Sequence, residues 1–232
     1  MVLDHIDIIY FINLDRRPDR LAEITGELAK INTPAEKIIR VSGMDHQFGI
    51  YGCAMSHIAA IEHFIASGKN RCMIFEDDFE WTQPKEIVES VMSHVLGTYP
   101  EIGCLVISGL IHNMLDTNDP LVKKPTYVAT CAGYSITRKF APSLLANFKE
   151  SAELQQKSIL ETGGPNEGYN HDCWWYRLQV DSGSFFITNP LLGRQRLSYS
   201  DITNVSSVTV SNIFLRNADL SMEYLRAQYR DF

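Results

Sequence analysis

Three consecutive carboxylates, Glu76, Asp77 and Asp78, directly follow the short apolar run at residues 71–75. A buried strand normally avoids unpaired charge, so carboxylates crowded at its end need a positive partner. In an open α/β sheet, ligands bind beyond the carboxyl ends of the strands. A hard divalent cation, Mg²⁺ or Mn²⁺, held by carboxylates, water and phosphate oxygens would satisfy both conditions. The triplet alone is equally compatible with a solvated acidic turn.

A second polar group follows the first predicted strand, at Asn13 and at Asp15, Arg16, Arg17 and Arg20. In a doubly wound sheet this turn commonly holds a nucleotide, because the N–H groups of the next helix favour phosphate. Arginine suits bidentate phosphate binding, although Arg/Asp pairs on a solvated helix face would give the same pattern. The chain contains no Gly-x-Gly-x-x-Gly or Walker sequence, so it gives no support to a dinucleotide site or a P-loop.

Reactive side chains also lie at the starts of two further predicted helices. Ser56 and His57 fall in the first turn of a helix expected over 53–66, within reach of a ligand at the acidic triplet. A single helical histidine is more often structural than functional. Asp172 follows a glycine-rich loop and precedes aromatic residues, a position that suits either a general base or an ordinary N-cap.

The elements that must position these groups are predicted from hydrophobic periodicity. Strands are expected at 6–12, 37–41, 72–75, 103–108, 126–137 and 184–188, with helices at 18–30, 53–66, 84–96, 139–148, from 170 onward and at 218–229. Residues 111–125 are polar, contain two prolines and are predicted to form a surface loop. Alternating strands and helices in the first half predict an α/β fold with a mostly parallel central sheet flanked by helices.

Composition narrows the class of protein. The 232 residues are 45% hydrophobic with a net charge of −7, which favours one globular domain and argues against nucleic-acid or polybasic membrane binding. The N-terminus has no signal-peptide core, and no apolar run approaches the ~18 residues of a membrane span, so a cytoplasmic protein is expected. The five scattered cysteines contain no Cys-x-x-Cys pair; a zinc site is not expected, and Cys72 and Cys104 are predicted to be free and buried.

Three motifs, in one order, resemble glycosyltransferase family 25, which includes lipooligosaccharide and procollagen galactosyltransferases. They are Asn-Leu-Asp-Arg-Arg-Pro-Asp-Arg at 13–20, Gly-Cys-Ala-Met-Ser-His at 52–57 and Ile-Phe-Glu-Asp-Asp at 74–78. Weaker matches at 132–137 and at Asp172 extend the resemblance over residues 6–201. Each motif alone is weak, and the combination is specific.

The resemblance implies a GT-A glycosyltransferase fold, with a single domain spanning 1–232, a core at about 6–201 and a C-terminal helical tail at about 202–232. It implies a UDP-sugar donor and Mn²⁺ or Mg²⁺ held by Glu76 and Asp78. The residues it implies for donor binding are Asn13, Leu14, Arg17, Arg20, Ser56, His57, Asp77 and Gln195. Gln195 and Asp201 are expected to approach the donor or the metal.

The family is inverting, so a carboxylate must deprotonate the acceptor hydroxyl, and Asp172 is the candidate base. The chain departs from the family here, with Cys173 where cellular members have Glu. The expected reaction moves a hexose or N-acetylhexosamine from a UDP-sugar to a hydroxyl of a glycan or glycoprotein. The alternatives are an inactive sugar- or partner-binding module and a metal-dependent nucleotide-sugar phosphohydrolase. Donor sugar, linkage and oligomeric state stay open.

Overall fold

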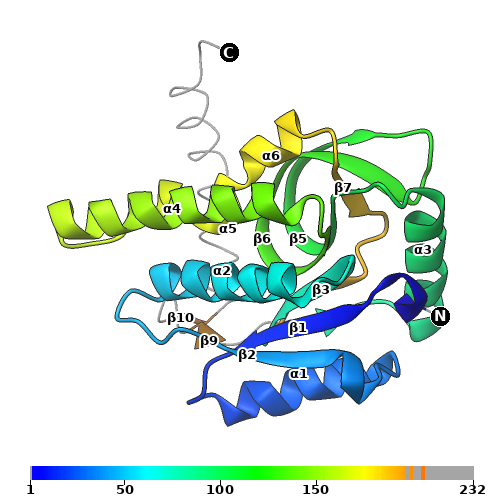
Figure 1. The fold of residues 1–232 in the computed structure, drawn as a ribbon, viewed down its shortest axis with the longest axis horizontal. Helices are drawn as coiled ribbons and strands as arrows, with labels where there is room; N and C mark the ends of the chain where they lie inside the picture. The colour runs from blue at the N-terminus through cyan, green and yellow to red at the C-terminus, as the bar shows by residue number, and fades with distance from the viewer. Residues whose placement is uncertain (1, 197–198, 201–204, 207–232) are drawn as a thin grey trace. The chain divides into compact units, whose positions relative to one another are not determined.

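The computed structural model of the protein describes residues 2–196, 199–200 and 205–206 (Figure 1). The chain divides into two compact units, residues 1–195 and residues 196–232. In the second unit, the described strands β9 (Tyr199–Ser200) and β10 (Val205–Ser206) form an antiparallel pair. The helix predicted at 218–229 and Asp201 lie outside the described residues.

The first unit is built on a six-stranded sheet with the order β2-β1-β3-β6-β5-β7. Its strands are β1 (Ile8–Asn13), β2 (Ile38–Ser42), β3 (Arg71–Glu76), β5 (Cys104–Asp116), β6 (Val122–Thr137) and β7 (Phe185–Thr188). All of these run in one direction except β6, which is antiparallel to its neighbours β3 and β5. The mostly parallel α/β sheet predicted from the sequence is confirmed.

Helices cover both faces of the sheet. They are α1 (Pro18–Lys30), α2 (Gly49–Ser67), α3 (Lys85–Thr98), α4 (Ala141–Thr162), α5 (His171–Trp174) and α6 (Tyr176–Asp181), with 3₁₀ turns η1 (Val2–His5), η2 (Ala35–Lys37) and η3 (Glu167–Tyr169). Alternate residues of a strand point to opposite faces, so Tyr10 packs in the core with α2 and α4, while Phe11 packs with α1 and α3. Figure 1 shows α2 and α4 side by side on one face. None of the helices in the described residues has the length and apolar character needed to cross a bilayer.

The carboxyl ends of the first and third strands meet at one edge of the sheet. Parallel pairing places Ile12 of β1 opposite Glu76 of β3, so Asn13 lies next to the acidic triplet. A short antiparallel pair, β4 (Phe79–Trp81) with β8 (Gly193–Gln195), sets Phe79 opposite Gln195. The fold therefore gathers three distant segments around the triplet.

The surface loop predicted at 111–125 is wrong, because β5 and β6 continue through it as a long hairpin. Four register shifts interrupt the pairing of these strands, and Pro125 is accommodated opposite Met114 next to one of them. Such irregular pairing disturbs the two-residue alternation from which a strand is normally recognised. The helix predicted at 139–148 is also too short: α4 reaches Thr162 because Ser151 and Gln155 continue its buried face.

Gly133 gives a test of the close packing beneath the site. It pairs with Phe75 on one side and Ser108 on the other, and a Cβ there would lie 2.8 Å from a ring carbon of Phe79. Gly133→Ala is expected to lower the free energy of unfolding by about 1–3 kcal/mol in urea denaturation. Gly26→Ala, in α1 with nothing within 4 Å, is the control and should raise it by about 0.5–1 kcal/mol. Equal stability of Gly133→Ala and the parent protein would contradict this packing.

Candidate functional site

One side of the site is a buried network around Asp77 and Asp78. Asp77 accepts hydrogen bonds from Asn13 Nδ2 at 2.8 Å and from Arg20 Nη1 at 2.9 Å. Asp78 Oδ2 accepts from the same Arg20 nitrogen at 3.3 Å and from Gln195 Nε2 at 3.1 Å. The structure thus brings together Asn13, Arg20 and Gln195, three of the residues proposed from sequence for donor binding.

Asp78 has one carboxylate oxygen with unused capacity. Its Oδ1 is buried and accepts no hydrogen bond from any described residue. Burial raises the pKa of Asp78, and the neighbouring Glu76 carboxylate raises it further. A buried carboxylate oxygen without a donor is costly unless a cation or an ordered water meets it. Asp78 is therefore a suitable ligand for a hard cation.

Glu76 points to the other face of the sheet. It follows the alternation of Cys72 and Ile74 in β3, both of which pack towards α2 and α4. Its Oε1 lies 3.1 Å from His57 Nε2 and 3.4 Å from Cys131 Sγ. Burial raises the pKa of Glu76, since the charged form loses its hydration. Glu76 therefore lies beside an imidazole and a thiol, whereas Asp77 lies beside an amide and a guanidinium.

Cys131 faces Glu76 and His57 because of an irregularity in β6. The left-handed backbone of Thr130, with φ 62°, lies within the register shift between β5 and β6. Val128, before Thr130, and Tyr134, after it, both face α2 and α4. Regular alternation from Val128 would turn Cys131 to the opposite face, but the irregularity at Thr130 turns it to the same face as these two residues. Bulges near functional sites commonly re-aim one side chain in this way.

His171 and Cys53 complete the cluster from two helices. His171 Nε2 lies 3.2 Å from Cys131 Sγ and 4.0 Å from Cys53 Sγ. Burial lowers the pKa of both His57 and His171 to about 3, so both imidazoles are neutral near pH 7. The sequence reasoning missed Cys53, Cys131 and His171. The available signal was the four-residue spacing of Cys53 and His57, which puts both on one helical face.

Asp172 is the second residue of α5, not its N-cap. Asn170 occupies the N-cap position, so the alternative that Asp172 is merely an N-cap is wrong. The carboxylate is half-buried, and burial raises its pKa. The Glu76 carboxylate also raises the pKa of Asp172, although His171 opposes this. A carboxylate whose pKa is raised towards neutrality is a better general base.

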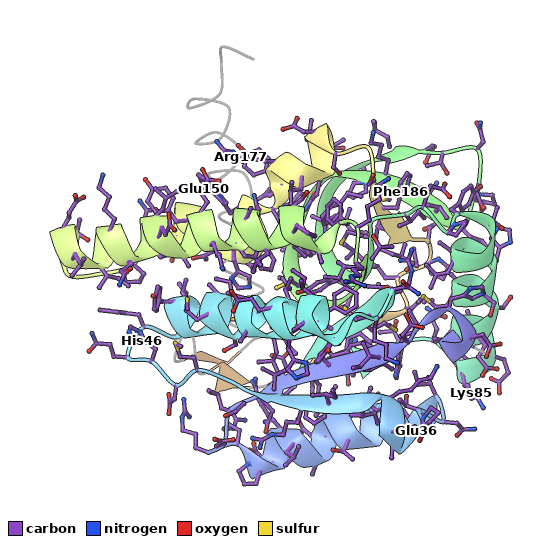
Figure 2. The ribbon with its side chains drawn as sticks, in the orientation of Figure 1. Glu36, His46, Lys85, Glu150, Arg177 and Phe186 are labelled. Atoms are coloured by element: carbon purple, nitrogen blue, oxygen red, sulfur yellow. The ribbon has the colours of Figure 1, made fainter. Side chains whose placement is uncertain are left out.

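The segment that carries Asp172 is fastened to α4. Ser151 Oγ donates to the carbonyl of Tyr169 at 2.6 Å, and Gln155 Nε2 donates to the carbonyl of Asn166 at 2.6 Å. Farther along, Glu150 of α4 pairs with Arg177 of α6 at 3.3 Å, and Figure 2 labels both side chains. The segment that carries Asp172 is therefore held to α4 both before and after that residue.

Three of the predicted donor-binding residues make local contacts. The Leu14 carbonyl accepts the Arg17 N–H at 2.9 Å, and the Arg17 guanidinium pairs with Asp19 at 2.7 Å. Ser56 Oγ donates to a carbonyl one turn earlier in α2 and accepts the Met44 N–H at 2.8 Å. Leu14 and Arg17 thus stand at the β1–α1 turn, whereas Ser56 anchors the loop before α2.

Negative charge exceeds positive charge at this edge of the sheet. Desolvation raises the pKa of the half-buried Cys53 thiol, and the carboxylates of Glu76, Asp172, Asp78 and Asp77 all raise it further. Within the described residues, only one cationic side chain, that of Arg20, hydrogen bonds to any of these four carboxylates. The site therefore favours a bound cation.

No protein-family model and no curated protein match the chain. Among solved structures, it is similar to a mannose-1-phosphate geranyltransferase from Thermus thermophilus, at 12% identity over 82% of this chain and 73% of that one, with a TM-score of 0.46. It is similar to A197 from STIV at 11% identity over 78% and 81%, with a TM-score of 0.40. A glycosyltransferase involved in glycosylating the major capsid of PBCV-1 matches at 9% identity over 78% and 91%, with a TM-score of 0.40. These similarities assign neither a substrate nor a reaction.

Arg20→Met tests the buried ion pairs. Removing the guanidinium leaves Asp77 and Asp78 buried without their cation, so the free energy of unfolding should fall by about 3–5 kcal/mol. Lys149→Met, which removes an exposed pair with Glu62, is the control and should cost about 0–1 kcal/mol. Urea denaturation measures both. A loss below about 1 kcal/mol for Arg20→Met would show that the triplet does not depend on this pair.

Proposed function

We propose that the protein is an inverting, metal-dependent glycosyltransferase with a GT-A fold. It would move a hexose or N-acetylhexosamine from a UDP-sugar to a hydroxyl of a glycan or glycoprotein. The observation that carries the proposal is the concentration of buried, incompletely neutralised carboxylates at the carboxyl edge of β3, beside the β1–α1 turn. The resemblance of the three sequence motifs to family 25 supports the donor class.

Asp78 and Glu76 would hold the Mn²⁺ or Mg²⁺ ion. Asp78 offers Oδ1, and Glu76 Oε2 makes no hydrogen bond within the described part of the chain. Carboxylate oxygens are the donors that these hard cations prefer. When bound, the cation would neutralise the negative charge that develops on the leaving diphosphate.

The nucleotide would lie against the β1–α1 turn. Asn13 ends β1, and Leu14 and Arg17 lie between it and α1, whose first backbone N–H groups and helix dipole favour phosphate. Arg20 and Asp77 would keep this turn fixed against β3. A second set of residues would act by positioning: Ser56 holds the loop before α2, His57 lies against Glu76, and Gln195 orients Asp78.

Asp172 would be the general base. In an inverting displacement the acceptor oxygen attacks from the face opposite the leaving phosphate, so the base must lie on the acceptor side. The raised pKa of Asp172 suits it to take the hydroxyl proton during attack. Its neighbour Cys173 has a pKa well above its usual value because of burial, so the thiol does not replace a carboxylate base.

Two other functions remain distinguishable by experiment. A phosphohydrolase would cleave the nucleotide-sugar without needing an acceptor, and a binding module would bind sugar or partner without turnover.

We also propose a cytoplasmic location, because all five cysteines are free and suit a reducing compartment.

Asp78→Asn tests the metal and the nucleotide together. By calorimetry, UDP should bind the parent protein far more tightly with Mn²⁺ than with EDTA, and more tightly than GDP, ADP or CDP. Asp78→Asn should abolish the difference between Mn²⁺ and EDTA, because the amide is a poor ligand for a hard cation. Circular dichroism checks that the fold is retained. Equal UDP affinity in Mn²⁺ and EDTA would exclude the metal assignment, and preference for another base would exclude UDP.

Asp172→Asn tests the base. Sugar transfer, measured as acceptor-dependent UDP release over a panel of UDP-sugars with Mn²⁺, should fall by about 10²–10⁴-fold. UDP affinity and stability should change little, because the amide keeps the size of the side chain. The exposed Asp181 at the end of α6 supplies the control, since Asp181→Asn should transfer sugar at the parent rate. Near-parental transfer by Asp172→Asn would place the base elsewhere.

A further inference from the structure

Five metal-ligating side chains from four elements converge in one cluster, here named the Cys–His cluster, in which Cys53 and Glu76 are half-buried and the other three are buried. Its members are Cys53 and His57 of α2, Glu76 of β3, Cys131 of β6 and His171 of α5. One ligand atom from each of Cys53, His57, Glu76 and His171 lies within 4.8 Å of all the others. Cys131 Sγ lies 3.2 to 3.4 Å from the facing atoms of His171, His57 and Glu76.

We propose that the Cys–His cluster binds one zinc-class transition-metal ion, with Cys53, Cys131, His57 and His171 as ligands and Glu76 as the adjoining oxygen donor. Two sulfurs and two ring nitrogens form the donor set typical of structural zinc. With Zn–S of about 2.3 Å and Zn–N of about 2.0–2.1 Å, tetrahedral ligands lie about 3.3–3.8 Å apart. The sulfur-to-nitrogen distances of 3.2, 3.4 and 4.0 Å bracket that range.

His57 is held with the correct nitrogen facing the cluster. Its Nδ1 lies 3.0 Å from the hydroxyl of Tyr134, and its Nε2 faces Cys131 and Glu76. A zinc-bound histidine usually hydrogen bonds through its other nitrogen, which fixes the tautomer and the ring orientation. Tyr134 is itself fully buried and stacks on the His57 ring, so this orientation is built into the core.

This site is distinct from the cation proposed at Asp78. Thiolates and imidazoles select softer metals such as zinc, whereas carboxylate and phosphate oxygens select Mg²⁺ and Mn²⁺. The second oxygen of Glu76, Oε2, would stay available to the Mn²⁺ or Mg²⁺ ion proposed at Asp78. An ion in the Cys–His cluster would tie α5, which carries Asp172, to β3, which carries the acidic triplet. Its role would thus be to fix the distance between the two halves of the candidate site.

The same atoms could instead share only protons. In that arrangement the Tyr134 hydroxyl donates to His57 Nδ1, His57 Nε2–H donates to Glu76, and the Cys131 thiol donates to His171. Each of these contacts is then satisfied without a metal, and the cluster would bind zinc weakly or at no fixed stoichiometry. Direct measurement of metal binding separates the two arrangements.

The experiment uses the full chain, stripped with a chelator under reducing conditions and titrated with Zn²⁺ alone. We expect one equivalent of Zn²⁺ per chain and a higher melting temperature, because an ion that binds only the folded state stabilises it. Titration with Co²⁺ should give thiolate-to-cobalt charge-transfer absorption. Absence of stoichiometric Zn²⁺ binding, or Co²⁺ bound without that absorption, would overturn the proposal.

Variants locate the ion. Cys131→Ser should weaken Zn²⁺ binding by at least about 100-fold, and Tyr134→Phe, which leaves every ligand in place, by about 10–100-fold. Cys104→Ser, at another fully buried cysteine outside the cluster, is the matched control and should bind like the parent. If Cys131→Ser fails to fold, Zn²⁺ binding by Tyr134→Phe and by the parent protein still tests the proposal. Unchanged Zn²⁺ affinity in folded Cys131→Ser or in Tyr134→Phe would overturn the proposal.

Asp78→Asn distinguishes this site from the proposed catalytic cation. It should retain the Zn²⁺ equivalent while losing the Mn²⁺-dependent part of UDP binding. Loss of Zn²⁺ together with Mn²⁺ would place a single ion at the triplet and refute a separate Cys–His site. Retained Zn²⁺ binding in a parent protein that binds no UDP would support the cluster and reject the proposed function.

Discussion

Three adjacent carboxylates, two of them buried, crowd the end of β3, and this is the constraint around which the site is organised. Charged groups taken out of water are stable only when paired or hydrogen bonded. Asn13, Arg20 and Gln195 approach Asp77 and Asp78 from three separate elements to supply those bonds. β1 ends at Asn13, α1 carries Arg20, and the pairing of β4 with β8 places Gln195 beside the end of the triplet.

The two-residue period of a strand then divides the triplet chemically. Glu76 continues the face of Cys72 and Ile74 and enters a layer of sulfur and imidazole donors, while Asp77 meets an amide and a guanidinium. One acidic motif therefore borders two environments of different softness. This division explains how a carboxylate edge suited to a hard cation can adjoin a cluster suited to zinc.

Asp172 depends on the same region through helix packing. Its helix α5 is too short to be stable alone, so it takes its place from α4, through the bonds of Ser151 and Gln155 to the preceding loop. His171, directly before it, joins the Cys–His cluster. The candidate base is thus fixed from two sides, and its raised pKa follows from burial near Glu76.

The sequence by itself determined the features that arise from local periodicity: α1 begins at Pro18 and ends at Lys30 as predicted, and Gly68 ends α2 in a left-handed conformation. The sequence also indicated the acidic triplet as a candidate cation site. Only the tertiary structure decided which donors meet it. Gln195 reaches Asp78 across 117 positions, and Cys53 reaches His171 across 118. Contacts at such separation leave no periodic trace, and the bulge that turns Cys131 inward breaks the alternation that would have predicted its face.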